Sequence, residues 1–186
     1  MNSINILVEE HNNIKKILKV IRKMCIDIVE DGEVNHQDFF AIVDFIRNYA
    51  DNYHHGKEED MLFEYMSDQL SQDIGEGPVR GMFIEHDYGR SFVANLELAV
   101  KSHKEGNNES KVDIIANAIG YANLLQNHIH KEDNVIYKYA SKHLDTETLE
   151  RLDKEFSDFE NKYENLEKKK KYLNLIESLQ KKYLEE

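Results

Sequence analysis

Apolar residues recur along most of this chain with the three-and-four spacing of amphipathic α-helices. Four such stripes are separated by short stretches in which the spacing fails. Because an amphipathic helix buries its apolar stripe against other helices, the pattern predicts an all-α fold, an up-down-up-down antiparallel four-helix bundle. The stripes span residues 4–28, 37–65, 79–100 and 114–139, and the interruptions lie at 31–32, 71–77, 106–108 and 143–144.

A further amphipathic segment follows the fourth stripe. Asp145 is a suitable N-cap, and apolar residues recur from Leu149 until a run of four lysines at 168–171 interrupts them. The spacing then resumes, which predicts one kinked helix or two consecutive helices. We therefore expect a four-helix bundle at 1–144 and a C-terminal helical extension at 145–186, which packs on the bundle or forms a homodimer interface.

Composition agrees with a few long helices, because the 186 residues include only 8 glycines and 1 proline. The formal net charge of −12 disfavours binding to nucleic acid or to an anionic membrane. No apolar run approaches the roughly 20 residues of a membrane span, the N-terminus lacks a secretory pattern, and the single cysteine, Cys25, cannot form an internal disulfide. These features predict a soluble, cytoplasmic protein.

The chain contains 9 histidines, and four of them occupy the apolar stripes, one on each predicted helix. A single buried histidine is usually a hydrogen-bonded core residue. Four histidines together with two carboxylates are too costly for packing alone, and a bound cation would offset that cost. The residues are His11, His54, His86 and His128, with Glu58 and Glu132 on the same stripes.

The four histidines are predicted to lie at one level of the bundle. Antiparallel helices joined by a short turn bring together residues that are equally far from that turn. His11 and His54 are equidistant from the first predicted turn, and His86 and His128 from the third. His54 and His86 are equidistant from residue 70, at the edge of the second turn.

An internal repeat supports this arrangement. Residues 54–63, HHGKEEDMLF, align with residues 128–137, HIHKEDNVIY, and the pair at 10–11 is echoed by the pair at 85–86. Each half thus supplies a lone histidine and a His-x-x-x-Glu motif, whose two side chains share one helix face. Such pseudo-twofold symmetry suits a pair of metal ions, since one ion would not need both glutamates.

The ligand types narrow the choice of ion. Imidazole with carboxylate suits iron, zinc and, less well, manganese, and the lack of cysteine ligands argues against a usual structural zinc site. Two divalent ions against two glutamates would leave a site that attracts hydroxide, peroxide or another small anion. Ferritin-like di-iron bundles use the opposite motif order, Glu-x-x-His, with further glutamates.

The order H, HxxxE, H, HxxxE, together with IEHDYGR at 84–90, resembles the bacterial hemerythrin-like, or HHE cation-binding, family over about residues 4–144. The resemblance implies a non-haem centre of two iron ions, bridged by the two glutamates and by an oxo or hydroxo group. Zinc or manganese would be the alternatives. The implied ligands are His11, His54, Glu58, His86, His128 and Glu132.

The chain departs from the oxygen-carrying hemerythrins at two positions. Those proteins have a second histidine one turn after the third-helix ligand, where this chain has Arg90. They also have an aspartate five residues after the fourth-helix histidine, where Asp133 follows the implied ligand Glu132. Fewer protein ligands would leave the iron more open, which favours reaction with oxygen, peroxide or nitric oxide over stable oxygen carriage.

We therefore expect a protein that binds, senses or scavenges a small diatomic or peroxide ligand. One alternative is an enzyme of iron and oxidative-stress defence, which decomposes peroxide or donates iron for iron–sulfur repair. Another is a structural or regulatory module that a metal ion stabilises.

Several other polar residues are not predicted to be metal ligands. His55 falls on the polar face of the second predicted helix, so His54 is the preferred ligand. Arg90 is expected to form a surface ion pair, with contact to a bound anion as the alternative. Glu10 and Glu85 are candidates for accepting hydrogen bonds from ligand histidines. The remaining histidines, His36, His103, His130 and His143, are expected to be exposed, and the tyrosines Tyr49, Tyr53, Tyr121 and Tyr139 are expected in the core or as hydrogen-bond donors near the metal.

Overall fold

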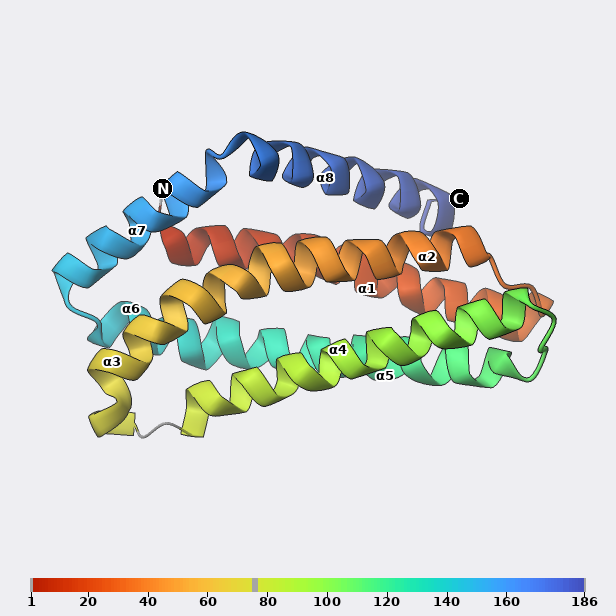
Figure 1. The fold of residues 1–186 in the computed structure, drawn as a ribbon, viewed down its shortest axis with the longest axis horizontal. Helices are drawn as coiled ribbons and strands as arrows, with labels where there is room; N and C mark the ends of the chain where they lie inside the picture. Colours follow the sequence, from red (N-terminus) through yellow and green to blue (C-terminus); the bar gives the residue numbers. More distant parts are fainter. Residues whose placement is uncertain (1, 75–76, 186) are drawn as a thin grey trace.

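The computed structural model describes residues 2–74 and 77–185. Within these ranges every regular element is a helix and no strand occurs. The helices form four long runs followed by two further helices. Figure 1 shows the chain direction reversing from each run to the next, with the C-terminal helices along one side of the bundle. The prediction of an all-α bundle with additional C-terminal helices is confirmed.

Two of the four runs are single α-helices, and the other two contain π-helical segments, in which hydrogen bonds close from residue i to i+5. The single helices are α1 (Ser3–Asp31) and α4 (Gly77–Lys104). The second run comprises α2 (His36–Phe45), η1 (Ile46–His55), η2 (Glu58–Leu62) and α3 (Phe63–Ile74). The fourth run comprises α5 (Ser110–Lys131), η3 (Glu132–Ile136) and α6 (Tyr137–His143).

The turns follow the local sequence closely, with one exception. Gly32 ends α1 with a φ of 75°, in the left-handed region that favours glycine. The loop predicted at 71–77 is wrong in extent, because α3 continues to Ile74 and α4 begins at Gly77, while residues 75 and 76 lie outside the described ranges. The apolar spacing ends earlier than the helix because polar residues such as those at 71–73 can also continue a helix, so a break in the spacing does not mark a helix end.

The C-terminal extension forms two helices, α7 (Thr146–Glu160) and α8 (Tyr163–Tyr183). The side chain of Asp145 accepts a hydrogen bond from the backbone N–H of Thr148 at 2.7 Å, as an N-cap does. The helices separate at residues 161–162, and the lysine run lies inside α8, because lysine is a good helix former. Both helices pack on α1.

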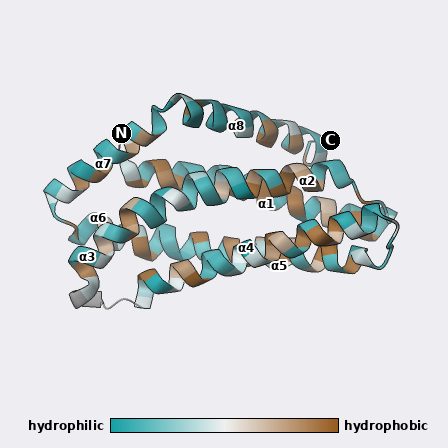
Figure 2. Ribbon diagram, viewed as in Figure 1, coloured by the Kyte–Doolittle hydropathy of each residue, from teal (hydrophilic) through white to brown (hydrophobic). Residues whose placement is uncertain are grey.

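The interior consists of two apolar clusters with a polar layer between them. On α1, for example, Leu7 belongs to one cluster and Ile14 to the other, while His11 lies between them. The extension joins both clusters, through Phe156 of α7 and Ile176 of α8. Figure 2 shows hydrophobic and hydrophilic positions alternating along the helices, in keeping with the predicted stripes.

Candidate metal centre

The polar layer contains all six of the side chains that the sequence singled out. None exposes more than 2% of its surface. The two oxygens of Glu132 lie 3.3 Å from Nε2 of His11 and 3.1 Å from Nε2 of His128. The Nε2 atoms of His86 and His128 are 3.0 Å apart. The structure thus brings together His11, His54, Glu58, His86, His128 and Glu132.

These side chains and one additional histidine form two groups that could each hold a metal ion. Within each group the candidate ligand atoms all lie within 4.8 Å of one another. Glu58 belongs to both groups, and its two oxygens allow it to contact two ions. The first group is His11, His54, Glu58 and Glu132, and the second is His55, Glu58, His86 and His128.

The presence of His55 corrects the prediction that it lies on a polar face. His55 is 6% exposed, and its ring stacks on that of His86 with the ring centroids 3.8 Å apart. The cause is the π-helical segment η1, whose wider turn allows the adjacent His54 and His55 both to face the interior. The internal repeat indicates the inward position of His55, because the residue aligned with it is the apolar Ile129, which is also buried.

Each of these five histidines has its Nδ1 atom close to a carboxylate. An ionised carboxylate can only accept, so Nδ1 donates, and the lone pair of the neutral imidazole lies on Nε2. In four of the five rings Nε2 faces Glu58 or Glu132. The Nδ1 partners are Asp133 for His11 at 2.7 Å, Glu10 for His54 at 2.9 Å, Asp51 for His55 at 3.3 Å, Glu59 for His86 at 2.5 Å and Glu85 for His128 at 2.9 Å.

Four of these carboxylates follow the internal repeat. The residue before each lone histidine, Glu10 or Glu85, holds the histidine of the HxxxE motif in its own half. The residue after each central glutamate, Glu59 or Asp133, holds the lone histidine of the other half. Sequence reasoning raised only Glu10 and Glu85, because the other two bonds connect different halves.

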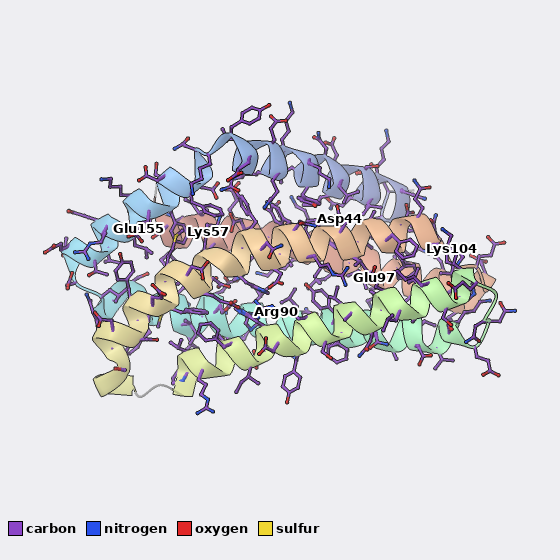
Figure 3. All side chains as sticks on the ribbon, viewed as in Figure 1. Asp44, Lys57, Arg90, Glu97, Lys104 and Glu155 are labelled. Atoms are coloured by element: carbon purple, nitrogen blue, oxygen red, sulfur yellow. The ribbon has the colours of Figure 1, made fainter. Side chains whose placement is uncertain are left out.

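Every one of the five carboxylates also contacts a cation. Arg90 lies 2.8 Å from oxygens of both Asp51 and Glu59, so one guanidinium holds the partners of His55 and His86. Figure 3 shows Arg90 between α4 and the second helical run. Arg90, whose side chain is 39% exposed, forms the surface ion pairs that the sequence predicted, and two of them hold carboxylates that contact histidines of the centre. The other contacts join Lys57 to Glu10, Lys131 to Glu85 and Lys15 to Asp133.

These ion pairs favour the ionised form of most of the carboxylates. Burial alone would raise the pKa of Asp51, but hydrogen bonds from His55 and Arg90 lower the pKa to about 2. The same balance between burial and hydrogen-bonded partners lowers the pKa values of Glu59, Glu85 and Asp133. Glu10 differs, because burial outweighs the Lys57 charge and raises the Glu10 pKa to about 7.

The two halves differ in how the lysine of the HxxxE motif is covered. Lys57 is fully buried, and its Nζ lies 2.6 Å from an oxygen of Glu160, the last residue of α7. The hydroxyl of Tyr53 donates to that same oxygen at 2.7 Å. Lys131, the aligned lysine, has a side chain that is 44% exposed. The C-terminal extension is therefore linked through Lys57 to Glu10, the carboxylate that contacts His54, whereas the matching lysine of the other half is largely exposed.

The central glutamates create an electrostatic problem that a cation would solve. One oxygen of Glu58, both oxygens of Glu132 and Nε2 of His54 are buried without a hydrogen-bond partner among the described residues. Burial and the charge of Glu132 raise the pKa of Glu58 well above its usual range. Burial also opposes ionisation of Glu132, but the surrounding histidines outweigh it and lower the Glu132 pKa. A metal ion would partner all of these atoms, so the residues fit one.

Sequence reasoning missed Tyr137, whose hydroxyl donates to Glu58 and lies 3.4 Å from Nε2 of His11. Its ring stacks on His11 with the centroids 5.4 Å apart. The aligned residue in the other half is Phe63, which stacks on His86. The repeat places an aromatic ring against each lone histidine, and only the first group has a hydroxyl there.

Four histidines lie outside this centre. His130 and His143 are exposed, as predicted. His36 and His103 are half-buried and lie 2.8 Å apart through Nε2 and Nδ1, so the prediction of their exposure is wrong. The first and third turns lie at the same end of the bundle (Figure 1), which brings these two histidines together.

Buried histidines and carboxylates that converge between antiparallel helices define the class of helical-bundle proteins that bind metal ions. The family model for the hemerythrin HHE cation-binding domain matches residues 2–140. The chain therefore belongs to the hemerythrin HHE cation-binding family, as the sequence motifs predicted. No curated protein and no solved structure matched the chain in the corresponding comparisons.

Among the described residues, no helix is both long enough and apolar enough to cross a lipid bilayer.

Proposed function

We propose that this protein holds two iron ions and uses them to bind, sense or scavenge a small oxidant. The first ion would be held by His11, His54, Glu58 and Glu132, and the second by His55, His86 and His128 with Glu58. The proposal is supported most by a single observation. Five histidine Nδ1 atoms each face a carboxylate, which leaves five Nε2 atoms free to act as ligands.

The protein residues would fix the positions of the ions and neutralise part of their charge. Two divalent ions against Glu58 and Glu132 leave a net positive centre, and neutral imidazoles do not change that charge. The outer carboxylates would keep each histidine in the tautomer that binds metal. Iron would supply one-electron chemistry and coordination positions for a small molecule.

The apolar clusters on both sides of the centre support a site from which bulk water is largely excluded. In such low-dielectric surroundings the attraction between a cation and its ionised ligands is stronger than it is in water. His55 also modifies the expectation of a more open iron, because it adds a ligand where the sequence had suggested a shortage. The second position would then have three histidines, and the first would have two histidines beside the Tyr137 hydroxyl.

Metal analysis combined with optical spectroscopy tests this proposal. Protein from iron-replete cells, purified without oxygen, should contain about two iron ions per chain and should develop a visible absorption band after exposure to air. The variants H54A and E132A should lose iron, whereas H143A, at an exposed position outside the centre, should keep it. Colourless, iron-free protein would overturn the proposal. Protein that holds a redox-inactive metal and melts when that metal is removed would point to a structural module.

A further inference from the structure

A groove of about 540 Å³ lies between α1 and α5. None of the residues that line it belongs to the two groups of candidate metal ligands or to the C-terminal helices α7 and α8. Sites for small molecules typically measure roughly 300–1,000 Å³, so the groove is large enough for a molecule of the size of a nucleotide. Its lining combines cationic side chains, neutral amides and an apolar floor.

The groove is positively charged, although the whole chain carries a net charge of −12. Residues 11–26 of α1 include five lysines and arginines but no aspartate or glutamate, and residues 114–130 of α5 include none of these four residue types. The α5 wall therefore supplies no carboxylate to neutralise the cations of α1. Four of those cations line the groove, and one of them, Lys15, pairs with Asp133 at 2.9 Å.

The other three lining cations are Lys16, Lys19 and Arg22. Nζ of Lys16 donates to the neutral side chain of Asn13 at 3.1 Å. Within the part of the chain that the structure describes, none of the three forms an ion pair with a carboxylate. An anion with two or three negative charges can therefore bind these side chains without displacing another anion.

The uncharged part of the lining suits the organic part of a ligand. The amide side chains of Asn12, Asn123 and Gln126 each offer a donor and an acceptor, which match the edge of a nucleobase or the hydroxyls of a sugar. Leu18 and Ala122 are buried and form an apolar floor. An inorganic anion would leave these groups unused, and a partner helix would need a longer apolar groove than the two side chains provide.

We propose that this groove binds a phosphorylated small molecule of nucleotide size, such as a nucleoside diphosphate. Lys16, Lys19 and Arg22 hold the phosphate oxygens, and the three amides contact the base and the sugar. An arginine suits phosphate because its guanidinium can donate two parallel hydrogen bonds. The inference goes beyond the proposed function and does not rest on it, because none of these contacts involves the metal centre.

Two lysines of α1 provide a matched pair of variants. Lys19 lines the groove, whereas Lys23, four residues later on the same helix, pairs with Asp27 and does not line it. K19Q and K23Q change the net charge equally, so a difference between them measures binding in the groove rather than general attraction to the protein. A second pair lies on α5, where Asn123 lines the groove, Asn127 does not, and both side chains are exposed.

Isothermal titration calorimetry of the full chain, as purified, with ADP, GDP, CDP and UDP tests the proposal. At least one of these nucleotides should bind at one site per chain. K19Q should weaken that binding about tenfold, the effect of one lost charged hydrogen bond, while K23Q should leave it within about twofold. A lack of saturable binding by all four nucleotides, or equal losses in K19Q and K23Q, would overturn the proposal.

A titration with inorganic pyrophosphate separates the phosphate contacts from the organic ones. Pyrophosphate should bind the wild type more weakly than the nucleotide does. N123A should weaken the nucleotide several-fold relative to N127A and leave pyrophosphate unchanged. Pyrophosphate that binds as tightly as the nucleotide would overturn the proposal, because the amides and the floor would then contribute nothing. All four substitutions lie at exposed or half-buried side chains, so each variant should fold.

Discussion

The imidazole rings of His55 and His86 lie face to face, with their centroids 3.8 Å apart and their planes 13° apart. They come from η1 and α4, and one side chain links their partners, because Arg90 contacts both Asp51 and Glu59. Arg90, which lies outside the centre, therefore fixes both of the carboxylates that orient the stacked rings.

Replacement of His55 tests whether it is a metal ligand. H55N keeps an N–H donor for Asp51 but removes Nε2, so one of the two positions should lose affinity for iron by at least the 10–100-fold that loss of an outer partner costs. Metal titration with analysis of iron content would measure the change. H130N, at an exposed histidine of the aligned motif, is the control. Two tightly bound ions in H55N would exclude His55 as a ligand.

Replacement of Arg90 tests the outer contacts. R90Q releases Asp51 and Glu59 together, so His55 and His86 lose their fixed orientation, and we expect metal affinity at that position to fall by roughly 10–100-fold. R47Q is the matched control, because Arg47 pairs with Glu97 and contacts none of the five outer carboxylates. The same metal titration applies. Equal affinities in R90Q and R47Q would show that Arg90 forms only a surface ion pair.

The aligned lysines should differ sharply in their effect on stability. K57M leaves the buried Glu10 without its cation and removes one of the two lysines that contact Glu160, and we expect a loss of about 3–5 kcal/mol in the free energy of unfolding. K131M removes a largely exposed contact to Glu85 and should cost less than about 1 kcal/mol. Urea denaturation of both variants measures the difference. Similar losses in the two variants would contradict the inference that the contact between Lys57 and Glu160 of the C-terminal extension stabilises the centre.

Glu58 should have opposite effects in the presence and absence of metal. E58Q removes a shared ligand and should abolish binding of at least one ion. In the metal-free protein Glu58 has a raised pKa, so its contribution to stability is present below its unfolded pKa and is lost as pH rises. Gln has no charge to bury, so metal-free E58Q should become progressively more stable than the metal-free wild type above about pH 4.5.

Thermal unfolding at pH 5, 7 and 8, with and without chelator, would check this prediction. A metal-free E58Q protein that is less stable than the wild type at pH 8 would contradict the assigned environment. Asp68→Asn, at an exposed position on α3, serves as the charge-matched control.

Sequence alone determined the bundle and its central residues. The helical stripes reflect a local property, because side chains three and four residues apart share a helix face wherever they are buried. The equal distances of the histidines from the turns, and the repeat at 54–63 and 128–137, then placed His11, His54, His86 and His128 at one level. Antiparallel helices joined by short turns bring residues equally far from a turn to the same level, so that inference follows from the sequence positions.

Tertiary structure decided which residues complete the centre. His55 faces inward because η1 departs from the 3.6-residue period that the sequence argument assumed. The bond from His11 to Asp133 and the contact of Lys57 with Glu160 connect residues more than 100 positions apart. Such contacts depend on how far each helix is shifted and rotated against its neighbours. Local periodicity does not determine those shifts, and only the packed bundle fixes them.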